Sequence, residues 1–169
     1  MKFKNTRLVL ATVIFLAGIN SFAGTPKNII LMISDGCGYN HIDAASIFQY
    51  GEIGRQIYEQ FPVKYAMSTY SIESPVYHPD SAWSRFDYVR KKPTDSAASA
   101  TAMATGFKTY NGAIGVDTAK TNLKNIIERL EQLGKATGVV TTVPFSHATP
   151  AAFVVHNEKR GHYVEIARE

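Results

Sequence analysis

Cysteine is almost absent from this sequence, since Cys37 is the only one in 169 residues. No disulfide can form within the chain, so a packed core or bound metals must stabilise the fold. No H-E-x-x-H or D-x-x-x-H cluster occurs, which excludes those two compact metal motifs. The chain also lacks repeats and low-complexity linkers, and its 45% apolar content fits one globular domain with a single core.

A block of basic residues is also missing. Lysine and arginine total 18 against 14 acidic residues, a net charge of +4. Three of the basic residues, Lys2, Lys4 and Arg7, lie within residues 1–23, which hold no acidic residue. The remainder holds 15 basic and 14 acidic residues, a net charge of +1. The composition therefore argues against a nucleic-acid partner.

Residues 1–23 have the pattern of a secretory signal peptide. A basic start is followed by an apolar run, residues 8–18, which is shorter than the roughly 20 residues that span a bilayer. Ser21-Phe22-Ala23 has the small residues of a cleavage site. We expect cleavage after Ala23, with residues 24–169 periplasmic or secreted and without a stable membrane anchor. An uncleaved anchor is the alternative.

The remaining chain alternates apolar runs with helical patterns. Such alternation predicts an α/β fold, a three-layer αβα sandwich with a mostly parallel sheet. The predicted strands cover 28–34, 63–71 and 136–142, and the predicted helices cover 40–50, 57–61 and 120–134, the last capped by Thr121. A long loop is expected over 72–92.

A further short helix is predicted inside the small-residue segment 93–106. Asp95 or Ser96 can cap its N-terminus, and Gly106 can end it. Because a helix N-terminus favours anions, a nucleophile there is well placed to attack an anionic substrate. The alternative is a tightly packed Ala/Ser helix with an ordinary cap.

Polar side chains follow two of the predicted strands. Asp35 comes after the first strand within Asp-Gly-Cys-Gly, and His147 and Thr149 follow the strand 136–142. Ligands of open α/β sheets bind at this edge, and carboxylate and hydroxyl oxygens suit a divalent metal. The alternatives are a plain Asp-Gly turn and a helix start with Thr149 as cap before Pro150.

The segment 93–117 resembles the active-site region of alkaline phosphatases. Its D-S-A-A-S-A-T run matches the family sequence around the serine that becomes phosphorylated, and T-G-x-K-T-x-N-G-x-I-G-V continues the match. Pro93 departs from the Ile or Val usual two residues before the aspartate. The likeness extends over residues 27–165 and implies a phosphate-monoester hydrolase.

The resemblance also assigns roles to individual residues. It implies Ser96 as nucleophile and zinc ligand, Asp35 as a ligand bridging zinc and magnesium, and Thr149 as a magnesium ligand. Arg160 would bind the substrate phosphate, although by its Glu and Lys neighbours alone it would be placed on a solvated helix end. Behind these ligands, Asp95 would orient Arg160, and His147 would lie near magnesium and phosphate. The cofactors implied are two Zn²⁺ and one Mg²⁺, and a homodimer is possible.

Alkaline phosphatases are several hundred residues long, and their zinc ligands lie largely later in the chain. We therefore expect these residues to be the N-terminal part of a longer enzyme, with a fold incomplete at its C-terminus and inactive alone. Three other classes stay open. They are a Ser-His-Asp hydrolase using Ser96, His147 and Asp35, a related metal-dependent sulfatase or phosphodiesterase, and a non-enzymatic secreted module.

Overall fold

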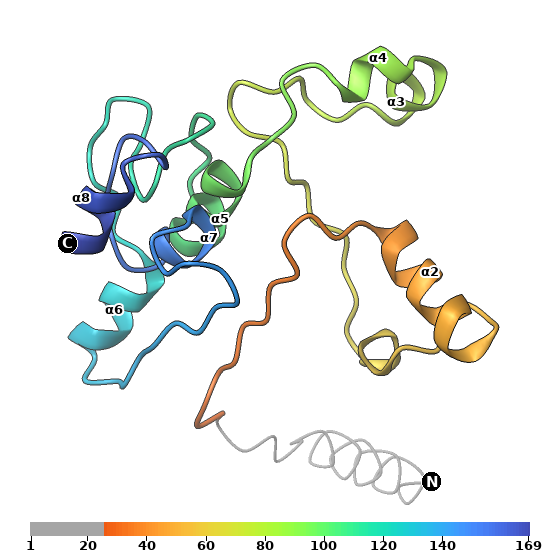
Figure 1. Ribbon diagram of the computed structural model, residues 1–169, viewed down its shortest axis with the longest axis horizontal. Coiled ribbons are helices and arrows are strands. Elements are labelled where there is room, and N and C mark those ends of the chain that lie inside the picture. The colour runs from red at the N-terminus through yellow and green to blue at the C-terminus, as the bar shows by residue number, and fades with distance from the viewer. Residues whose placement is uncertain (1–25) are drawn as a thin grey trace, which may run out of the picture. The chain divides into compact units, whose positions relative to one another are not determined.

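The computed structural model describes residues 26–169, so the expected signal peptide lies outside the described residues. Contacts divide the chain into two units, residues 1–33 and 34–169. Every helix below belongs to the second unit (Figure 1). The helices are α2 (Tyr39–Tyr50), the 3₁₀ helix η1 (Ile57–Gln60), α3 (Pro79–Ser84), α4 (Phe86–Val89), α5 (Ser96–Thr105), α6 (Ile126–Gln132), α7 (Ala148–Ala151) and α8 (Tyr163–Arg168).

The three segments predicted as strands do not pair in this structure. Residues 26–169 contain only two isolated bridges, Ile114 with Asn157 and Val116 with Asn122. No backbone hydrogen bond among the described residues involves 28–33, 63–70 or 136–142. A strand needs a neighbour for its N–H and C=O groups, and none lies beside these segments. The predicted parallel sheet is therefore absent from the described residues.

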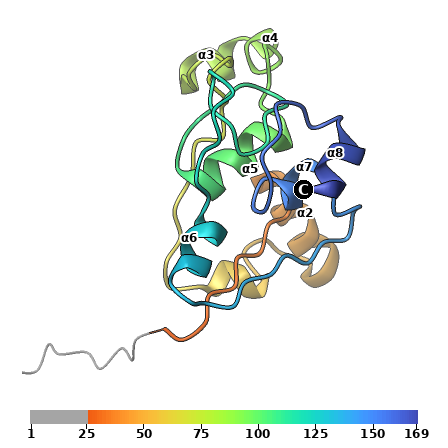
Figure 2. The same cartoon turned by 90° about the vertical axis from the view of Figure 1, so that its left-hand side faces the viewer.

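The burial predicted for residues 28–34 is also wrong in this structure. Ile29 is 83% exposed and Met32 is 89% exposed. Apolar side chains favour burial, but a strand is buried on both faces only where other layers cover it. Figure 2 shows the long connection between α6 and α7, which contains the third predicted strand, as an extended trace.

The core of the second unit is built from small side chains on α5 and α7. Ala97, Ala100 and Ala104 of α5 are buried together with Ala148 and Ala151 of α7. Alanine favours the helix and lets two backbones approach closely, which a larger residue would prevent. The larger members of the core are Ile114, Phe153, Val155 and Ile166.

The ends of α5 confirm the predicted helix. Asp95 is the N-cap, and its side chain accepts a hydrogen bond from the backbone N–H of Ala98. Gly106 ends the helix with a φ of 80°, a left-handed conformation that costs glycine little. The N–H of Gly106 donates to the carbonyl of Ala102. The helix that carries Ser96 is thus fixed at both termini.

Two helix boundaries differ from the sequence prediction. The helix predicted over 120–134 begins only at Ile126, because Asn125, not Thr121, forms its cap in a reciprocal box with Glu128. Thr149 does not cap α7, because the helix begins at Ala148 and His147 holds the N-cap position. The region 72–92, predicted as a loop, contains α3 and α4.

None of the helices within residues 26–169 is long and apolar enough to cross a membrane.

Candidate active site

Asp35, Ser96 and Thr149 meet although the chain separates them widely. The Ser96 hydroxyl donates to Oδ1 of Asp35 over 3.3 Å, and the Thr149 hydroxyl donates to Oδ2 over 2.7 Å. Ser96 is the first residue of α5, and Thr149 lies in α7. Packing of α5 against α7 therefore brings both hydroxyls to one carboxylate.

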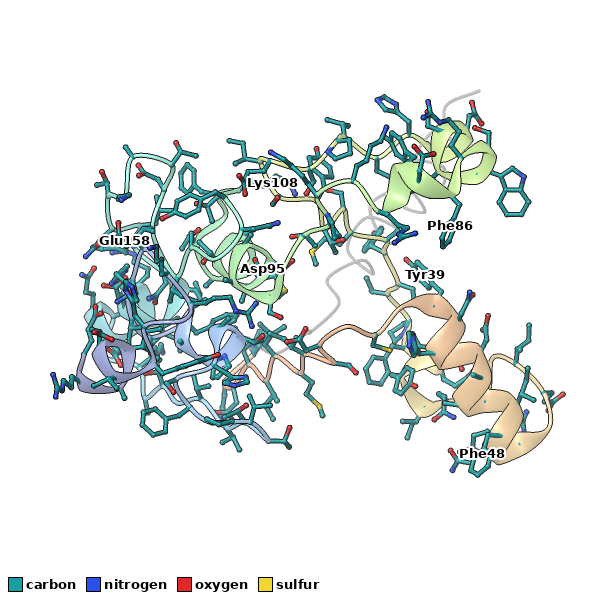
Figure 3. All side chains as sticks on the ribbon, turned by 45° about the horizontal axis from the view of Figure 1, so that its top comes forward. Tyr39, Phe48, Phe86, Asp95, Lys108 and Glu158 are labelled. Atoms are coloured by element: carbon teal, nitrogen blue, oxygen red, sulfur yellow. The ribbon has the colours of Figure 1, made fainter. Side chains whose placement is uncertain are left out.

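Asp95 joins three parts of the second unit. Its Oδ1 caps α5 at Ala98, and its Oδ2 accepts from the N–H of Gly112 and from Nη1 of Arg160, both over 3.0 Å. Arg160 is thus not on a solvated helix end, since it lies between α7 and α8 and is half-buried. Figure 3 shows Asp95 at the start of α5. The carboxylate holds the guanidinium close to the helix N-terminus that carries Ser96.

His147 is held by stacking. Its ring lies 5.6 Å from the ring of Tyr163, with 24° between the planes. Among the described residues, no hydrogen bond joins His147 to Ser96, and Asp35 accepts directly from the serine. A triad in which a histidine takes the serine proton is therefore not assembled.

Sequence reasoning missed Asn111, which fixes the entry to α5. Its side chain accepts from the N–H of Asp95 over 3.3 Å and donates to the carbonyl of Pro93 over 2.8 Å. Its own N–H donates to Glu73 over 2.9 Å. The signal was present in the Asn-Gly pair that precedes the buried Ala113. Such a pair indicates a turn, but a turn by itself does not reveal which backbone it contacts.

The donor set at Asp35 suits a hard divalent cation. One carboxylate and two hydroxyls supply only oxygen, which Mg²⁺ prefers over nitrogen or sulfur. Zinc commonly takes His or Cys ligands, and residues 26–169 hold no group of three His, Cys, Asp or Glu side chains close enough to share an ion. The described residues therefore fit part of a magnesium site better than a complete zinc site.

A second charged cluster lies in the turn that contains Arg160. Lys120 forms an ion pair with Glu158. The hydrogen bond from Lys120 lowers the pKa of the Glu158 carboxylate, and the same bond raises the pKa of Lys120. Burial raises the pKa of Tyr110, whose hydroxyl donates to the Glu158 carbonyl over 3.0 Å. Both partners of the ion pair are therefore charged near neutral pH.

The profile of the alkaline phosphatase family matches residues 26–169. This chain belongs to the alkaline phosphatase family. Alkaline phosphatase 4 of Bacillus subtilis is 40% identical over 142 residues, which cover 83% of this chain and 28% of that protein. The family predicted from the segment 93–117 is confirmed.

Solved alkaline phosphatases resemble this fold. The enzyme of the Antarctic bacterium TAB5 superposes with a TM-score of 0.66 at 40% identity, covering 85% of this chain and 36% of that one. A variant of the TAB5 enzyme, solved with Mg bound in its M3 site, gives a TM-score of 0.65 with the same identity and coverage. The fold is alkaline-phosphatase-like, and the chain spans about a third or less of the relatives it matches.

Proposed function

We propose that the protein containing this chain hydrolyses phosphate monoesters through a phosphoserine on Ser96. The observation that carries the proposal is the convergence of Ser96 and Thr149 on the Asp35 carboxylate, beside the paired Asp95 and Arg160. Membership of the alkaline phosphatase family supports the substrate class.

The residues have distinct roles in this proposal. The Ser96 oxygen attacks phosphorus, the ester P–O bond breaks, and the alcohol leaves; water then cleaves the P–O bond to serine and releases phosphate. The guanidinium of Arg160 offers a planar fork to two phosphate oxygens, and Asp95 holds it in place. The N–H groups at the start of α5 add positive potential around the attacked phosphate.

We assign Asp35 and Thr149 to Mg²⁺, with Asp35 and Ser96 also facing the zinc ions that the family resemblance implies. Divalent metals, when bound, lower the pKa of a coordinated hydroxyl and neutralise phosphate charge. His147 belongs near this site but contacts neither Asp35 nor Ser96 by a hydrogen bond among the described residues. Tyr163 fixes its ring instead.

The test of the function uses the full-length protein that contains this chain. Ser96→Ala should abolish phosphoserine labelling by a radioactive phosphate ester and most of the turnover. Ser99→Ala is the matched control, because Ser99 lies on the same helix and its hydroxyl contacts Thr94, not Asp35. Full turnover in Ser96→Ala would rule out this nucleophile. Turnover of sulfate esters or phosphodiesters in preference to monoesters would favour the related enzyme classes.

Residues 26–169 hold no group of three His, Cys, Asp or Glu side chains close enough to share an ion, and the family resemblance implies zinc ligands later in the chain. We therefore propose that residues 24–169 alone are inactive. We also propose that the segments 28–34, 63–71 and 136–142 enter the sheet of an αβα sandwich in the complete protein. Expression of residues 24–169 and assay with excess zinc and magnesium test the first point. Turnover of about 1 per second or more would show that the described residues suffice.

The periplasmic or secreted location is likewise a proposal that rests on residues 1–23. N-terminal sequencing of the exported protein should begin at Gly24. A sequence that began at Met1 would contradict cleavage and favour the anchor. Dimerisation stays a prediction, and sedimentation of the full-length protein would measure it.

A further inference from the structure

The chain enters the helix that carries Ser96 through a strained backbone. Lys92 has a φ of 43°, a left-handed conformation that is unfavourable for a residue with a side chain. Its carbonyl accepts from the hydroxyl of Ser74 over 2.6 Å, and the next carbonyl, of Pro93, accepts from the side chain of Asn111 over 2.8 Å. Strained backbone persists only where its surroundings hold it. Side chains outside α5 therefore fix the approach to the nucleophile.

The turn at Asn111 and Gly112 holds both members of the Asp95–Arg160 ion pair. The side-chain oxygen of Asn111 accepts from the backbone N–H of Asp95 over 3.3 Å, and the N–H of Gly112 donates to Oδ2 of the same residue over 3.0 Å. The carbonyl of Gly112 accepts from the backbone N–H of Arg160 over 2.8 Å. One turn thus fixes the arginine relative to the start of α5.

Glu73 anchors this turn from a third segment. Its Oε2 accepts from the backbone N–H of Asn111 over 2.9 Å. Beside it, the N–H of Ile72 donates to the carbonyl of Thr109 over 3.0 Å. Asn111 is half-buried, and its N–H, side-chain oxygen and side-chain nitrogen all take part in hydrogen bonds. The turn is therefore organised without a ligand, which reduces the cost of orienting the groups that it holds.

We propose that Asn111 is a positioning residue for phosphate binding, which acts by holding Asp95 and, through Asp95, the guanidinium of Arg160. The proposal rests on the proposed function, because that function places the phosphate on Arg160. The hydrogen bonds of Asn111 among the described residues go to Glu73, Pro93 and Asp95, so its effect on the phosphate passes through the ion pair. A guanidinium held in place beforehand needs no reorganisation when the phosphate binds.

The test measures the Kd of inorganic phosphate by calorimetry on the full-length protein loaded with zinc and magnesium. Arg160→Ala should weaken binding about tenfold or more, because charged hydrogen bonds are lost. Asn111→Ala should weaken it about three- to tenfold, the size of one neutral hydrogen bond. In an Arg160→Ala background, Asn111→Ala should have little further effect, because the guanidinium through which it acts is absent.

Asn125→Ala is the matched control for a general loss of stability. Asn125 is buried and caps α6 through its bonds with Glu128, away from the ion pair. The variant should lower the melting temperature and leave the Kd of phosphate unchanged.

A second pair of variants decides the matter if Asn111→Ala does not fold. Glu73→Ala and Glu73→Gln remove the same charge from an exposed position, but only glutamine can still accept from the N–H of Asn111. The alanine variant should therefore bind phosphate about twofold more weakly than the glutamine variant. Equal Kd values in these two variants would count against the positioning role.

The outcomes separate this role from the proposed function. If Arg160→Ala weakens phosphate binding and Asn111→Ala does not, the positioning role is overturned and the proposed function stands. The positioning role also fails if Asn125→Ala weakens binding equally, or if the effect of Asn111→Ala persists in full without Arg160. Unchanged binding in Arg160→Ala would overturn the phosphate role of Arg160 and the positioning role with it.

Discussion

Thr149 donates a 2.7 Å hydrogen bond to Asp35, a residue 114 positions earlier in the chain. The bond joins the turn before α2 to the first turn of α7. Each carboxylate oxygen of Asp35 therefore accepts from one hydroxyl: Oδ2 from Thr149 and Oδ1 from Ser96. This arrangement of oxygen donors is the part of the site that a divalent cation can be expected to recognise.

We predict that Mg²⁺ stabilises the chain weakly through these oxygens. A ligand at ten times its Kd adds about 1.4 kcal/mol to the free energy of unfolding. Few protein ligands imply a Kd in the millimolar range, and thermal unfolding at increasing Mg²⁺ measures it. Asp35→Asn should abolish the Mg²⁺ effect. Asp43→Asn, at a half-buried position of α2 away from these oxygens in sequence, should retain it; loss in both variants would indicate unspecific charge screening.

The sequence predicted the local parts of this site well. Asp95 caps α5 and Gly106 ends it, because short side-chain oxygens and left-handed glycines act within a few residues of their own position. The family resemblance also brought Asp35, Ser96 and Thr149 together as one site. These features depend on local chemistry or on a long motif, and both can be read from one chain.

The sequence could not predict which distant residues hold the start of α5 in place. Asn111 contacts Pro93 and Asp95 across 16 to 18 residues, and the pairing depends on the path of the chain between them. The prediction of a sheet is wrong for a related reason. The segments 28–34 and 136–142 are apolar, but they can pair only if neighbouring strands are present. Periodicity gives the preference for burial, while the covering layers decide whether it is realised.

Thr101 should be essential to the packing of α5. Its buried hydroxyl donates to the carbonyl of Ala113 and accepts from the N–H of Gly115, both over 2.9 Å. Thr101→Val keeps the shape but leaves both backbone groups unpaired, so we expect a loss of about 2–4 kcal/mol. Thr101→Ser keeps the hydroxyl and should cost about 1 kcal/mol. Urea unfolding measures both values, and equal losses would show that the two hydrogen bonds of the hydroxyl contribute no more than the methyl group.

Gly115 is predicted to tolerate no side chain. Its φ is +59°, and a Cβ would lie 2.6 Å from the carbonyl oxygen of Val155 and 2.9 Å from the ring of His156. Left-handed strain of about 1–2 kcal/mol and overpacking of about 1–3 kcal/mol together predict a loss of about 2–5 kcal/mol for Gly115→Ala.

Two other glycines separate these causes. Gly134 has a φ of +69° and no atom within 4 Å of a built Cβ, so Gly134→Ala should show the strain alone, about 1–2 kcal/mol. Gly138 has neither a positive φ nor a close neighbour, and Gly138→Ala should stay within about 0.5 kcal/mol. The three variants are compared by urea unfolding. If Gly115→Ala costs no more than Gly134→Ala, the close approach of Val155 is not limiting.

The ion pair between Lys120 and Glu158 predicts a pH window for stability. The pKa of Glu158 is lowered from 4.5, so its contribution is complete above pH 4.5 and is lost as the pH falls through the folded-state value. The pKa of Lys120 is raised from 10.5, so its contribution is complete below pH 10.5 and is lost as the pH rises through the folded-state value. The pair thus contributes in full between these two limits.

Glu158→Gln should therefore lower the melting temperature by a constant amount inside this window, and the difference should vanish in acid once Glu158 is protonated. Both side chains are largely exposed, so added salt should shrink the difference. In a Lys120→Met background the same substitution should have a much smaller effect, because the main partner charge is absent and only Lys159 and His162 still act on Glu158. A difference of unchanged size in that background, or one that is insensitive to pH, would assign the effect to packing of the Glu158 side chain.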